Sequence, residues 1–277
     1  MIISRLYGGL GNQLFQYAAA KKLSIETNNK LFVNKSLFSN GNYIHSFELD
    51  KFKITNDGYY NFNKLDKLKL KLAKVGLINF SNVITEKNYD IKVNSVKKTL
   101  FLDDYWQDEK YFKKIKNILS NEFMPKRISK NAKILVKKIQ DSNSVCVHIR
   151  RGDYLKLENL DSLGICSTDY YRNAIDLMIK KLDKPKFFVF SDDIEWCKIN
   201  IRINGYSYFI PDDYTNIDSF YLMRNCRHYI ISNSTFSWWP AWLSNYHSKV
   251  VTAPKIWWKS RPWSSPVLNN WVKINNE

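Results

Sequence analysis

The chain of 277 residues carries 43 lysine and arginine residues against 26 acidic ones, a formal net charge of +17, and 44% of its residues are hydrophobic. This apolar fraction excludes a disordered chain and is enough for one large or two modest domains. The basic excess favours anionic partners, which include phosphorylated sugars, acidic lipid headgroups and nucleic acid.

The sequence also indicates where the protein works. Its four cysteines, Cys146, Cys166, Cys197 and Cys226, form no C-x-x-C pair, so we expect neither a zinc knuckle nor a dense disulfide framework. The first residues lead directly into a glycine loop without a signal peptide, and no apolar run approaches the roughly 18 to 20 residues that span a bilayer. We therefore expect a cytoplasmic protein, either soluble or peripheral on the inner membrane.

The chain opens with a strand, a turn and a helix. Residues 2–7 are extended and apolar, glycines in 8–11 form the turn, and the apolar residues from Leu14 to Leu23 fall near helical spacing. Residues 31–33 predict a second strand, whereas 35–64 show no sustained period and are predicted to form loops and short strands. This order is typical of a β/α unit.

Residues 64–75 predict a basic amphipathic helix. The apolar stripe contains Leu65, Leu68, Leu72 and Val75, and the basic stripe beside it contains Lys64, Lys67, Lys71 and Lys74. Two interpretations are open at this stage. The leucines can pack into the protein interior, or the helix can lie on an anionic membrane surface.

From Ser144 onward, short apolar strands alternate with segments of helical length. The predicted strands are 145–149, 187–190, 208–210, 229–231 and 250–252, and the predicted helices are 170–182, 193–201, 216–226 and 235–245. This alternation predicts a doubly wound parallel sheet, in which ligands bind beyond the carboxyl ends of the strands. A break in the pattern near Pro125 predicts a lobe of residues 1–125 and a lobe of residues 126–277.

The strongest motif is V-H-I-R-R-G-D-Y at residues 147–154. Two adjacent guanidiniums, from Arg150 and Arg151, can fork onto the oxygens of a diphosphate at the end of a strand. Gly152 lets the backbone turn there, and Asp153 can orient a guanidinium or accept a proton from an attacking hydroxyl. The alternative interpretation is an ordinary surface loop with a structural arginine–aspartate pair.

A second motif is hydroxyl-rich and precedes a helix. Amides at a helix amino terminus, together with serine and threonine hydroxyls, form an anion site that can share the diphosphate. The residues concerned are Ser232, Asn233, Ser234 and Thr235. Ser234 or Thr235 can instead simply cap the helix, and both functions are compatible. The following Trp238, Trp239 and Trp242 have helical neighbour spacing and are expected in the core.

Two further clusters complete the candidate set. Gly9 and Gly11 allow a ligand to approach the backbone, and the amides of Asn12 and Gln13 can bond to sugar hydroxyls. This loop is not a dinucleotide fingerprint, because leucine stands where the third glycine is needed. After a predicted strand, Ser191-Asp192-Asp193 places a carboxylate where the N1 and N2 hydrogens of guanine can be read, although Ser191 or Asp192 can also cap a helix.

No Asp-x-Asp pair occurs in the sequence, so the usual carboxylates of a metal–nucleotide site are missing and no metal ion is expected. Outside the central motif, the histidines His45, His228 and His247 are scattered, and structural roles are expected for them.

Together, the segments G-G-L-G-N-Q, H-I-R-R-G-D-Y and S-N-S-T-F-S-W-W-P-A-W-L resemble glycosyltransferase family 11, the α-1,2-fucosyltransferases, in order and spacing along nearly the whole chain. The resemblance implies a GT-B type fold with two Rossmann-like lobes, GDP-L-fucose as donor, inversion at the anomeric carbon and no metal requirement. It also implies that Arg150 is the main diphosphate ligand, that His148 and residues 191–193 hold guanine, and that Ser234 and Thr235 hold phosphate.

The expected chemistry follows from these residues. Negative charge grows on GDP as the glycosidic bond breaks, so fixed cations and amides stabilise the transition state more than the ground state. The proton of the acceptor hydroxyl passes to Asp153, to solvent or to phosphate, and Asn12 and Gln13 position the acceptor or the fucose. The expected acceptor is a galactose-terminated or lipid-linked glycan of a surface polysaccharide, bound by the loops at 35–64, 76–110 and 154–168.

Three alternatives follow from the same sequence. The first is a transferase for another GDP-linked sugar or another linkage, because the motifs report the nucleotide better than the sugar. The second is a nucleic-acid binding protein, suggested by the charge, but the basic residues are spread along the chain without a recognised binding module, so we expect no nucleic acid. The third is a membrane-surface protein without catalysis, suggested by the basic helix.

Overall fold

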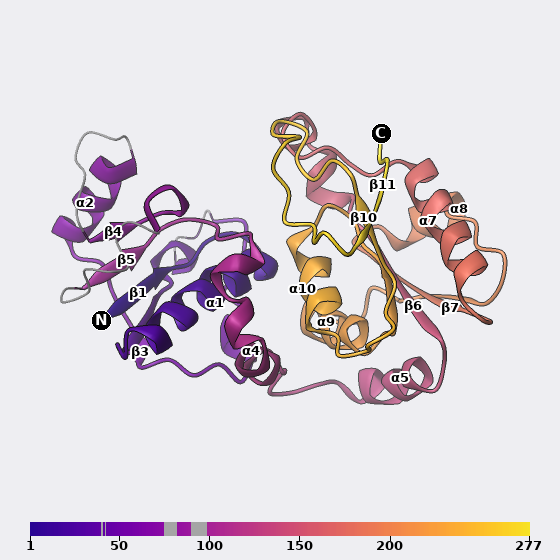
Figure 1. Cartoon of the computed structure of the whole chain (residues 1–277), viewed down its shortest axis with the longest axis horizontal. Coiled ribbons are helices and arrows are strands. Elements are labelled where there is room, and N and C mark those ends of the chain that lie inside the picture. Colours follow the sequence, from indigo (N-terminus) through magenta and orange to yellow (C-terminus); the bar gives the residue numbers. More distant parts are fainter. Residues whose placement is uncertain (40, 42, 75–81, 90–98) are drawn as a thin grey trace. The chain divides into compact units, whose positions relative to one another are not determined.

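The structure is a computed structural model that describes residues 1–39, 41, 43–74, 82–89 and 99–277. They divide into two compact units, Met1–Lys126 and Arg127–Glu277. Each unit contains a parallel sheet and helices that cover it (Figure 1). Among these residues, no helix is both long enough and apolar enough to cross a membrane.

The N-terminal unit is built on a five-stranded parallel sheet with the order β3-β2-β1-β5-β4. The strands are β1 (Ile2–Arg5), β2 (Leu31–Asn34), β3 (Gly58–Tyr59), β4 (Val83–Ile84) and β5 (Leu100–Leu102), and the helices are α1 (Leu10–Glu26), α2 (Lys64–Lys74) and α4 (Lys116–Glu122). The predicted strand, turn and helix at the start are confirmed, with the strand ending at Arg5 rather than at residue 7. Most of α1 is buried, because it packs against β1 and β2.

The prediction of loops at 76–110 was wrong for two segments, β4 and β5. β5 lies beside β1 in the middle of the sheet, and all three of its residues are buried. A strand this short shows no alternation of polar and apolar residues, so its sequence carries no periodic signal. Residues 75–81 and 90–98 of the predicted loop lie outside the described residues.

Helix α2 has a different buried face from the one that its sequence suggests. Leu70 is buried with Ile3, Val83 and Phe101, and Asp66, one turn before it, accepts hydrogen bonds from the Tyr60 hydroxyl at 3.0 Å and from the Asn63 amide at 3.2 Å. These contacts turn Leu65 and Leu68 outward, where they are 66% and 52% exposed. Packing of those two leucines into the interior was therefore a wrong prediction, because the polar contacts of Asp66 decide which face is buried.

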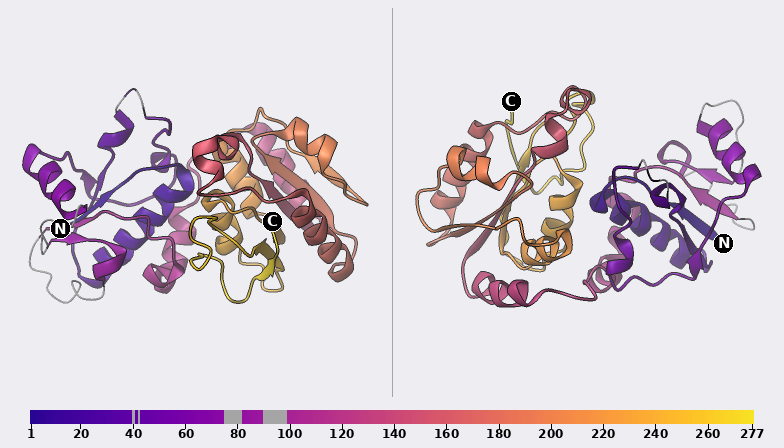
Figure 2. Two further views of the ribbon diagram at one scale, coloured as in Figure 1. Left: turned by 90° about the horizontal axis from the view of Figure 1, so that it is seen from above. Right: turned by 180° about the vertical axis from the view of Figure 1, so that it is seen from behind.

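The C-terminal unit has a six-stranded parallel sheet with the order β11-β10-β9-β6-β7-β8, the arrangement of a Rossmann fold. Its strands are β6 (Ser144–Ile149), β7 (Lys186–Ser191), β8 (Ser207–Phe209), β9 (His228–Ile230), β10 (Val251–Pro254) and β11 (Val272–Ile274). Its helices are α5 (Lys130–Gln140), α6 (Leu157–Leu160), α7 (Thr168–Lys181), α8 (Ile194–Asn200), α9 (Asn216–Arg224) and α10 (Thr235–Leu243). The predicted doubly wound sheet is confirmed: α7 and α8 lie on one face, and α9 and α10 on the other (Figures 1 and 2).

Side chains fix where five of the six helices of this unit begin, α6 being the exception. Ser129, Ser167, Asp193, Thr215 and Ser234 each accept a hydrogen bond from a backbone amide in the first turn of the helix that follows. Trp238, Trp239 and Trp242 of α10 are buried, with ring centroids 5.1 to 5.6 Å apart, which confirms their place in the core.

The strand order identifies one special position in the C-terminal sheet. The chain crosses this sheet in one direction from β6 to β8 and in the opposite direction from β9 to β11, so its direction reverses between β6 and β9. At such a switch point, the loops that leave the two neighbouring strands diverge and open a crevice at the carboxyl edge, where ligands of these folds bind.

Candidate active site

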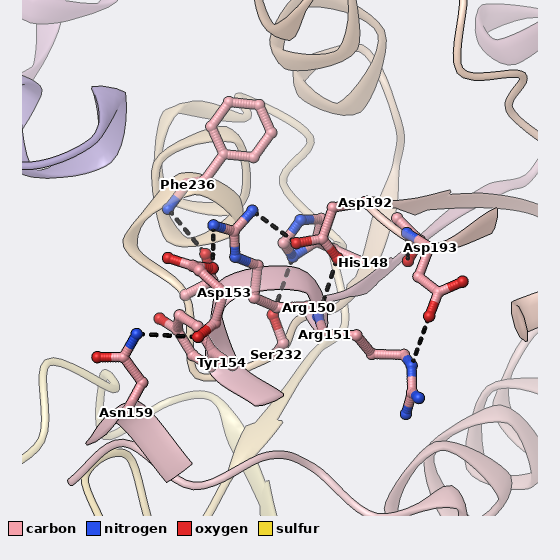
Figure 3. Close-up of polar contacts among 12 residues, drawn as sticks. His148, Arg150, Arg151, Asp153, Tyr154, Asn159, Asp192, Asp193, Ser232 and Phe236 are labelled. Atoms are coloured by element: carbon pink, nitrogen blue, oxygen red, sulfur yellow. Dashed lines mark hydrogen bonds and ion pairs between the residues drawn. The ribbon is translucent and has the colours of Figure 1, made fainter. Parts of the chain in front are cut away.

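His148 lies near the end of β6, beside the switch point. Its Nδ1 atom is 2.9 Å from the Ser232 hydroxyl, and its ring packs 5.7 Å from the ring of Phe236 (Figure 3). Burial, assisted by the nearby Arg150 charge, lowers the pKa of His148 to about 3. The imidazole is therefore neutral at physiological pH, and it offers one donor and one acceptor rather than a cation.

Arg150 follows β6 and is held between two carboxylates. One guanidinium nitrogen is 2.5 Å from Asp153 Oδ1, another is 2.9 Å from Asp192 Oδ2, and the guanidinium carbon is 5.5 Å from the centre of the Tyr154 ring (Figure 3). The Arg150 side chain remains 30% exposed. The end of β6 therefore presents a guanidinium that is oriented by its neighbours and still reachable from solvent.

Asp192 is fixed by a close approach to the backbone. Its second oxygen accepts the Arg151 amide at 2.9 Å, and a β-carbon at Gly152 would lie only 2.6 Å from its Oδ2 atom. The backbone of Gly152 does not have the positive φ angle that favours glycine. Glycine is needed here for space rather than for a turn, because a larger residue would displace the carboxylate that orients Arg150.

Arg151 points away from Arg150 (Figure 3). Its Nε atom is 3.1 Å from Asp193 Oδ2, and its guanidinium carbon lies 3.6 Å from the centre of the Trp196 ring in α8. Asp193 and Trp196 hold Arg151 on this side, whereas Asp153 and Asp192 hold Arg150. For this reason, the two guanidiniums, which the sequence suggested would fork onto one diphosphate, do not converge in this structure.

The hydroxyl-rich turn after β9 contributes two different kinds of residue. Ser232 faces His148, and Ser234 caps α10 at the Phe236 amide, 3.3 Å away, with Thr235 as the first residue of that helix. Asn233 is directed into the protein: its amide donates to the carbonyls of Leu163, Gly164 and Trp257 at 2.9, 3.1 and 3.2 Å. The side chain of Asn233 therefore holds loops in place around the site.

The structure thus joins three of the predicted clusters at one edge of the C-terminal sheet, from the ends of β6, β7 and β9. The loop of Gly9, Gly11 and Asn12 belongs to the other compact unit. Sequence reasoning missed Tyr154 and Trp196, whose rings contact Arg150 and Arg151. Its place as the last residue of the 147–154 motif was the only signal for Tyr154, to which the sequence gave no role, and Trp196 gave no signal.

The charges of the site are nearly balanced. Two guanidiniums, Arg150 and Arg151, face three carboxylates, Asp153, Asp192 and Asp193. Within the described ranges of the chain, no group of three or more His, Cys, Asp or Glu side chains is arranged to hold a metal ion. Because Arg150 is paired with Asp153 and Asp192, an anion that binds to its guanidinium must displace one of these carboxylates.

The sequence model of glycosyl transferase family 11 matches residues 5–275. An α-1,2-colitosyltransferase of Escherichia coli is 37% identical over 99% of each chain, and the O-antigen biosynthesis glycosyltransferase WbnK of Escherichia coli is 29% identical over 98% of this chain and 99% of its own. The human galactoside α-(1,2)-fucosyltransferase 1 is 32% identical over 47% of this chain and 38% of its own.

Solved structures share the fold at low sequence identity. Arabidopsis thaliana FUT1, in complex with GDP, superimposes with a TM-score of 0.55 at 11% identity, covering 90% of this chain and 69% of that one. The fucosyltransferase NodZ from Bradyrhizobium gives a TM-score of 0.50 at 13% identity, covering 86% and 91%. The expected GT-B type fold, with two Rossmann-like units, is confirmed. With a family match along nearly its whole length, the chain belongs to glycosyl transferase family 11 and is a glycosyltransferase.

Proposed function

We propose that the protein is an inverting, metal-independent α-1,2-fucosyltransferase that moves L-fucose from GDP-fucose to the 2-hydroxyl of a galactoside. The observation that carries this proposal is the oriented, solvent-reachable guanidinium of Arg150 at the switch point of a Rossmann-like sheet. A cation at that edge is suited to the diphosphate of a sugar nucleotide. Membership of the family supplies the type of reaction.

Donor binding requires Arg150 to exchange a carboxylate for phosphate. The pair with Asp153 is the one to open, because both side chains are 30% exposed and partly exposed ion pairs contribute only about 0 to 1 kcal/mol. Asp192 remains in place through the Arg151 amide. Arg150 then faces the oxygens on which charge develops as the fucosyl–phosphate bond breaks.

The same exchange releases Asp153. Inversion requires the acceptor hydroxyl to attack opposite GDP, and a carboxylate freed from Arg150 becomes able to accept its proton. Arg151, held against Trp196 and Asp193, supports the loop that carries Arg150. His148, Asp192 and Asp193 are proposed to face guanine, and Ser232, Ser234 and Thr235, with the first amides of α10, to face phosphate.

The donor sugar has a specific competitor. The relative that covers 99% of both chains at 37% identity is a colitosyltransferase, and colitose is fucose without the 3-hydroxyl. A site that bonds to this hydroxyl rejects the deoxy sugar by a factor of about 10⁴ or more, whereas an apolar site separates the two sugars only weakly. A strong preference for GDP-fucose over GDP-colitose therefore indicates a pocket that bonds to the 3-hydroxyl, and a weak preference indicates an apolar pocket.

A paired assay tests the donor. The protein is incubated with GDP-fucose, GDP-colitose or GDP-mannose and a galactose-terminated oligosaccharide, and products are followed by mass and linkage analysis. We expect a kcat/KM for GDP-fucose that exceeds the others by at least about tenfold. If GDP-colitose has the highest kcat/KM, the protein is a colitosyltransferase. If no GDP-sugar serves as donor, both the fucosyltransferase and the colitosyltransferase functions are rejected.

The exposed face of α2 favours a peripheral contact with an anionic inner membrane, where a lipid-linked O-antigen precursor is a suitable acceptor. Leu65 and Leu68 lie outward among the exposed Lys64, Lys67 and Lys71. Each lysine near an anionic bilayer contributes about 1 kcal/mol, so neutralising Lys67 and Lys71 should weaken binding to anionic vesicles by more than tenfold. Co-sedimentation that is absent, or equal for anionic and neutral vesicles, rejects this contact.

A further inference from the structure

In the N-terminal unit, polar and aromatic side chains follow two neighbouring parallel strands, β1 and β5. The two strands are paired in register, with Ser4 opposite Leu102. The residues that follow them therefore leave the same edge of the sheet together. Ligands of open parallel α/β sheets bind outside the carboxyl ends of the strands, and none of the residues at this edge takes part in the arginine site described above.

Two tyrosines face each other at this edge of the sheet. Tyr7 follows β1 and Tyr105 follows β5, with ring centroids 4.9 Å apart and an interplanar angle of 77°. The edge of one ring therefore packs against the face of the other, and Tyr105 remains 42% exposed. A braced, exposed tyrosine offers a rigid apolar surface with a polar tip, which suits the C–H face of a pyranose.

Two amides from the segments that carry the tyrosines also meet. Gln107 donates from Nε2 to Oδ1 of Asn12 at 2.7 Å, which leaves the Asn12 amino group and the Gln107 carbonyl as donor and acceptor for another molecule. Asn12 is positioned by a close contact: a β-carbon at Gly8 would lie 2.5 Å from its Nδ2 atom. Gln13, in contrast, is buried and bonds to the carbonyls of Gly8 and Ser46, so it supports the loop.

The charges near this group do not favour an anion. Arg5, the cation at the end of β1, is paired with the buried Asp103 at 2.9 Å. Asp104 accepts the amides of Glu86 and Tyr105 at 3.1 and 2.9 Å, which leaves a carboxylate close to the tyrosines. A phosphate or carboxylate ligand would meet this charge, whereas an uncharged polyol would not.

We propose that Tyr7, Tyr105, Asn12 and Gln107 form a binding subsite for an uncharged hexopyranose, the terminal galactose-type sugar of the acceptor. Tyr105 packs against the C–H face of the sugar, and the Asn12 and Gln107 amides bond to its hydroxyls. This proposal rests on the transferase function and assigns residues to its acceptor.

Kinetics with both substrates tests the subsite. Tyr105→Ala and Asn12→Ala should each raise the KM for acceptor by about three- to tenfold, the effect of losing one neutral contact, with the KM for GDP-fucose unchanged. Tyr105→Phe, which keeps the ring, should behave like the wild type. Tyr246→Ala is the matched control, because Tyr246 is another exposed tyrosine, at 39%, outside both the cluster and the segments expected to bind the acceptor.

A direct measurement separates this proposal from the transferase function. Saturation-transfer NMR with methyl β-galactoside and no donor should show binding to the wild type and to Tyr246→Ala, and weaker binding to Tyr105→Ala. GDP affinity equal to that of the wild type shows that each variant is folded. Unchanged acceptor KM and unchanged galactoside signal in Tyr105→Ala and Asn12→Ala overturn the subsite, even if the enzyme transfers fucose. A galactoside signal that depends on Tyr105, in a protein that transfers no fucose, supports the subsite and rejects the donor assignment.

Discussion

A glycine stands against a polar side chain just beyond the central strand of each sheet. In the C-terminal unit, Gly152 leaves room for the Asp192 carboxylate, which orients a guanidinium. In the N-terminal unit, Gly8 leaves room for the Asn12 amide, which pairs with another amide. In both units, the missing side chain of a glycine thus lets a polar side chain approach the backbone. That side chain is charged in the C-terminal unit and uncharged in the N-terminal unit. The two edges are suited to different ligands, and variants at each should affect different substrates.

The largest effect is expected from Arg150→Ala. This change removes the cation that faces the leaving diphosphate, so we expect kcat/KM to fall by roughly 100- to 1,000-fold. Arg150→Lys should restore only part of the activity, because an ammonium does not reproduce the planar fork. Steady-state kinetics and thermal unfolding of the purified variants measure both effects. If a folded Arg150→Ala enzyme keeps a kcat/KM within a few-fold of the wild type, Arg150 does not stabilise the leaving diphosphate.

Gly152→Ala sharpens the comparison, because it leaves Arg150 in the sequence and disturbs only its support. The new methyl group displaces Asp192 from Arg150 and from the Arg151 amide. The Arg150–Asp192 pair is partly exposed and contributes about 0 to 1 kcal/mol, so we expect kcat/KM for the donor to fall by about three- to fivefold. Asp192→Asn should give a similar loss. Unchanged donor kinetics in Gly152→Ala would show that Asp192 does not orient Arg150.

Gly8→Ala is the counterpart in the other unit and should differ in kind. Gly8 has a φ angle of +79°, where a β-carbon costs about 1 to 2 kcal/mol, and the methyl group would also press on Asn12. We expect a lower melting temperature and a raised KM for acceptor, with GDP affinity preserved. Calorimetry with GDP and thermal unfolding measure the two effects. A loss of GDP affinity in a folded Gly8→Ala protein contradicts the division between the two edges.

The sequence predicted the C-terminal sheet better than the N-terminal one, for a physical reason. β6, β7 and β9 are buried on both faces and read as apolar runs, and their polar clusters follow at the strand ends. β5 and β11 are as short as β9 but lie outside the regular alternation of strands and helices between residues 144 and 252, so no neighbouring pattern marked them as strands. The pairing of His148 with Ser232 follows from adjacent strands, but the direction of Arg151 depends on Trp196, a contact that no spacing rule contains.

The smallest effect is expected from chelation of metal ions, which tests whether the C-terminal edge stabilises the diphosphate without a metal ion. We predict full activity in excess EDTA, because Arg150 and the first amides of α10 are placed to face the charge that a metal ion would otherwise neutralise. The N-terminal edge differs in charge, because the carboxylates of Asp103 and Asp104 lie there. Burial, followed by the Asp104 charge, raises the pKa of Glu86. If EDTA abolishes transfer and magnesium or manganese restores it, the cation is a metal and the assignment of Arg150 as the main electrostatic group fails. Mild stimulation by added magnesium leaves the assignment intact, since free divalent ions also help product GDP to leave. Measuring initial rates separately from GDP release distinguishes these two results.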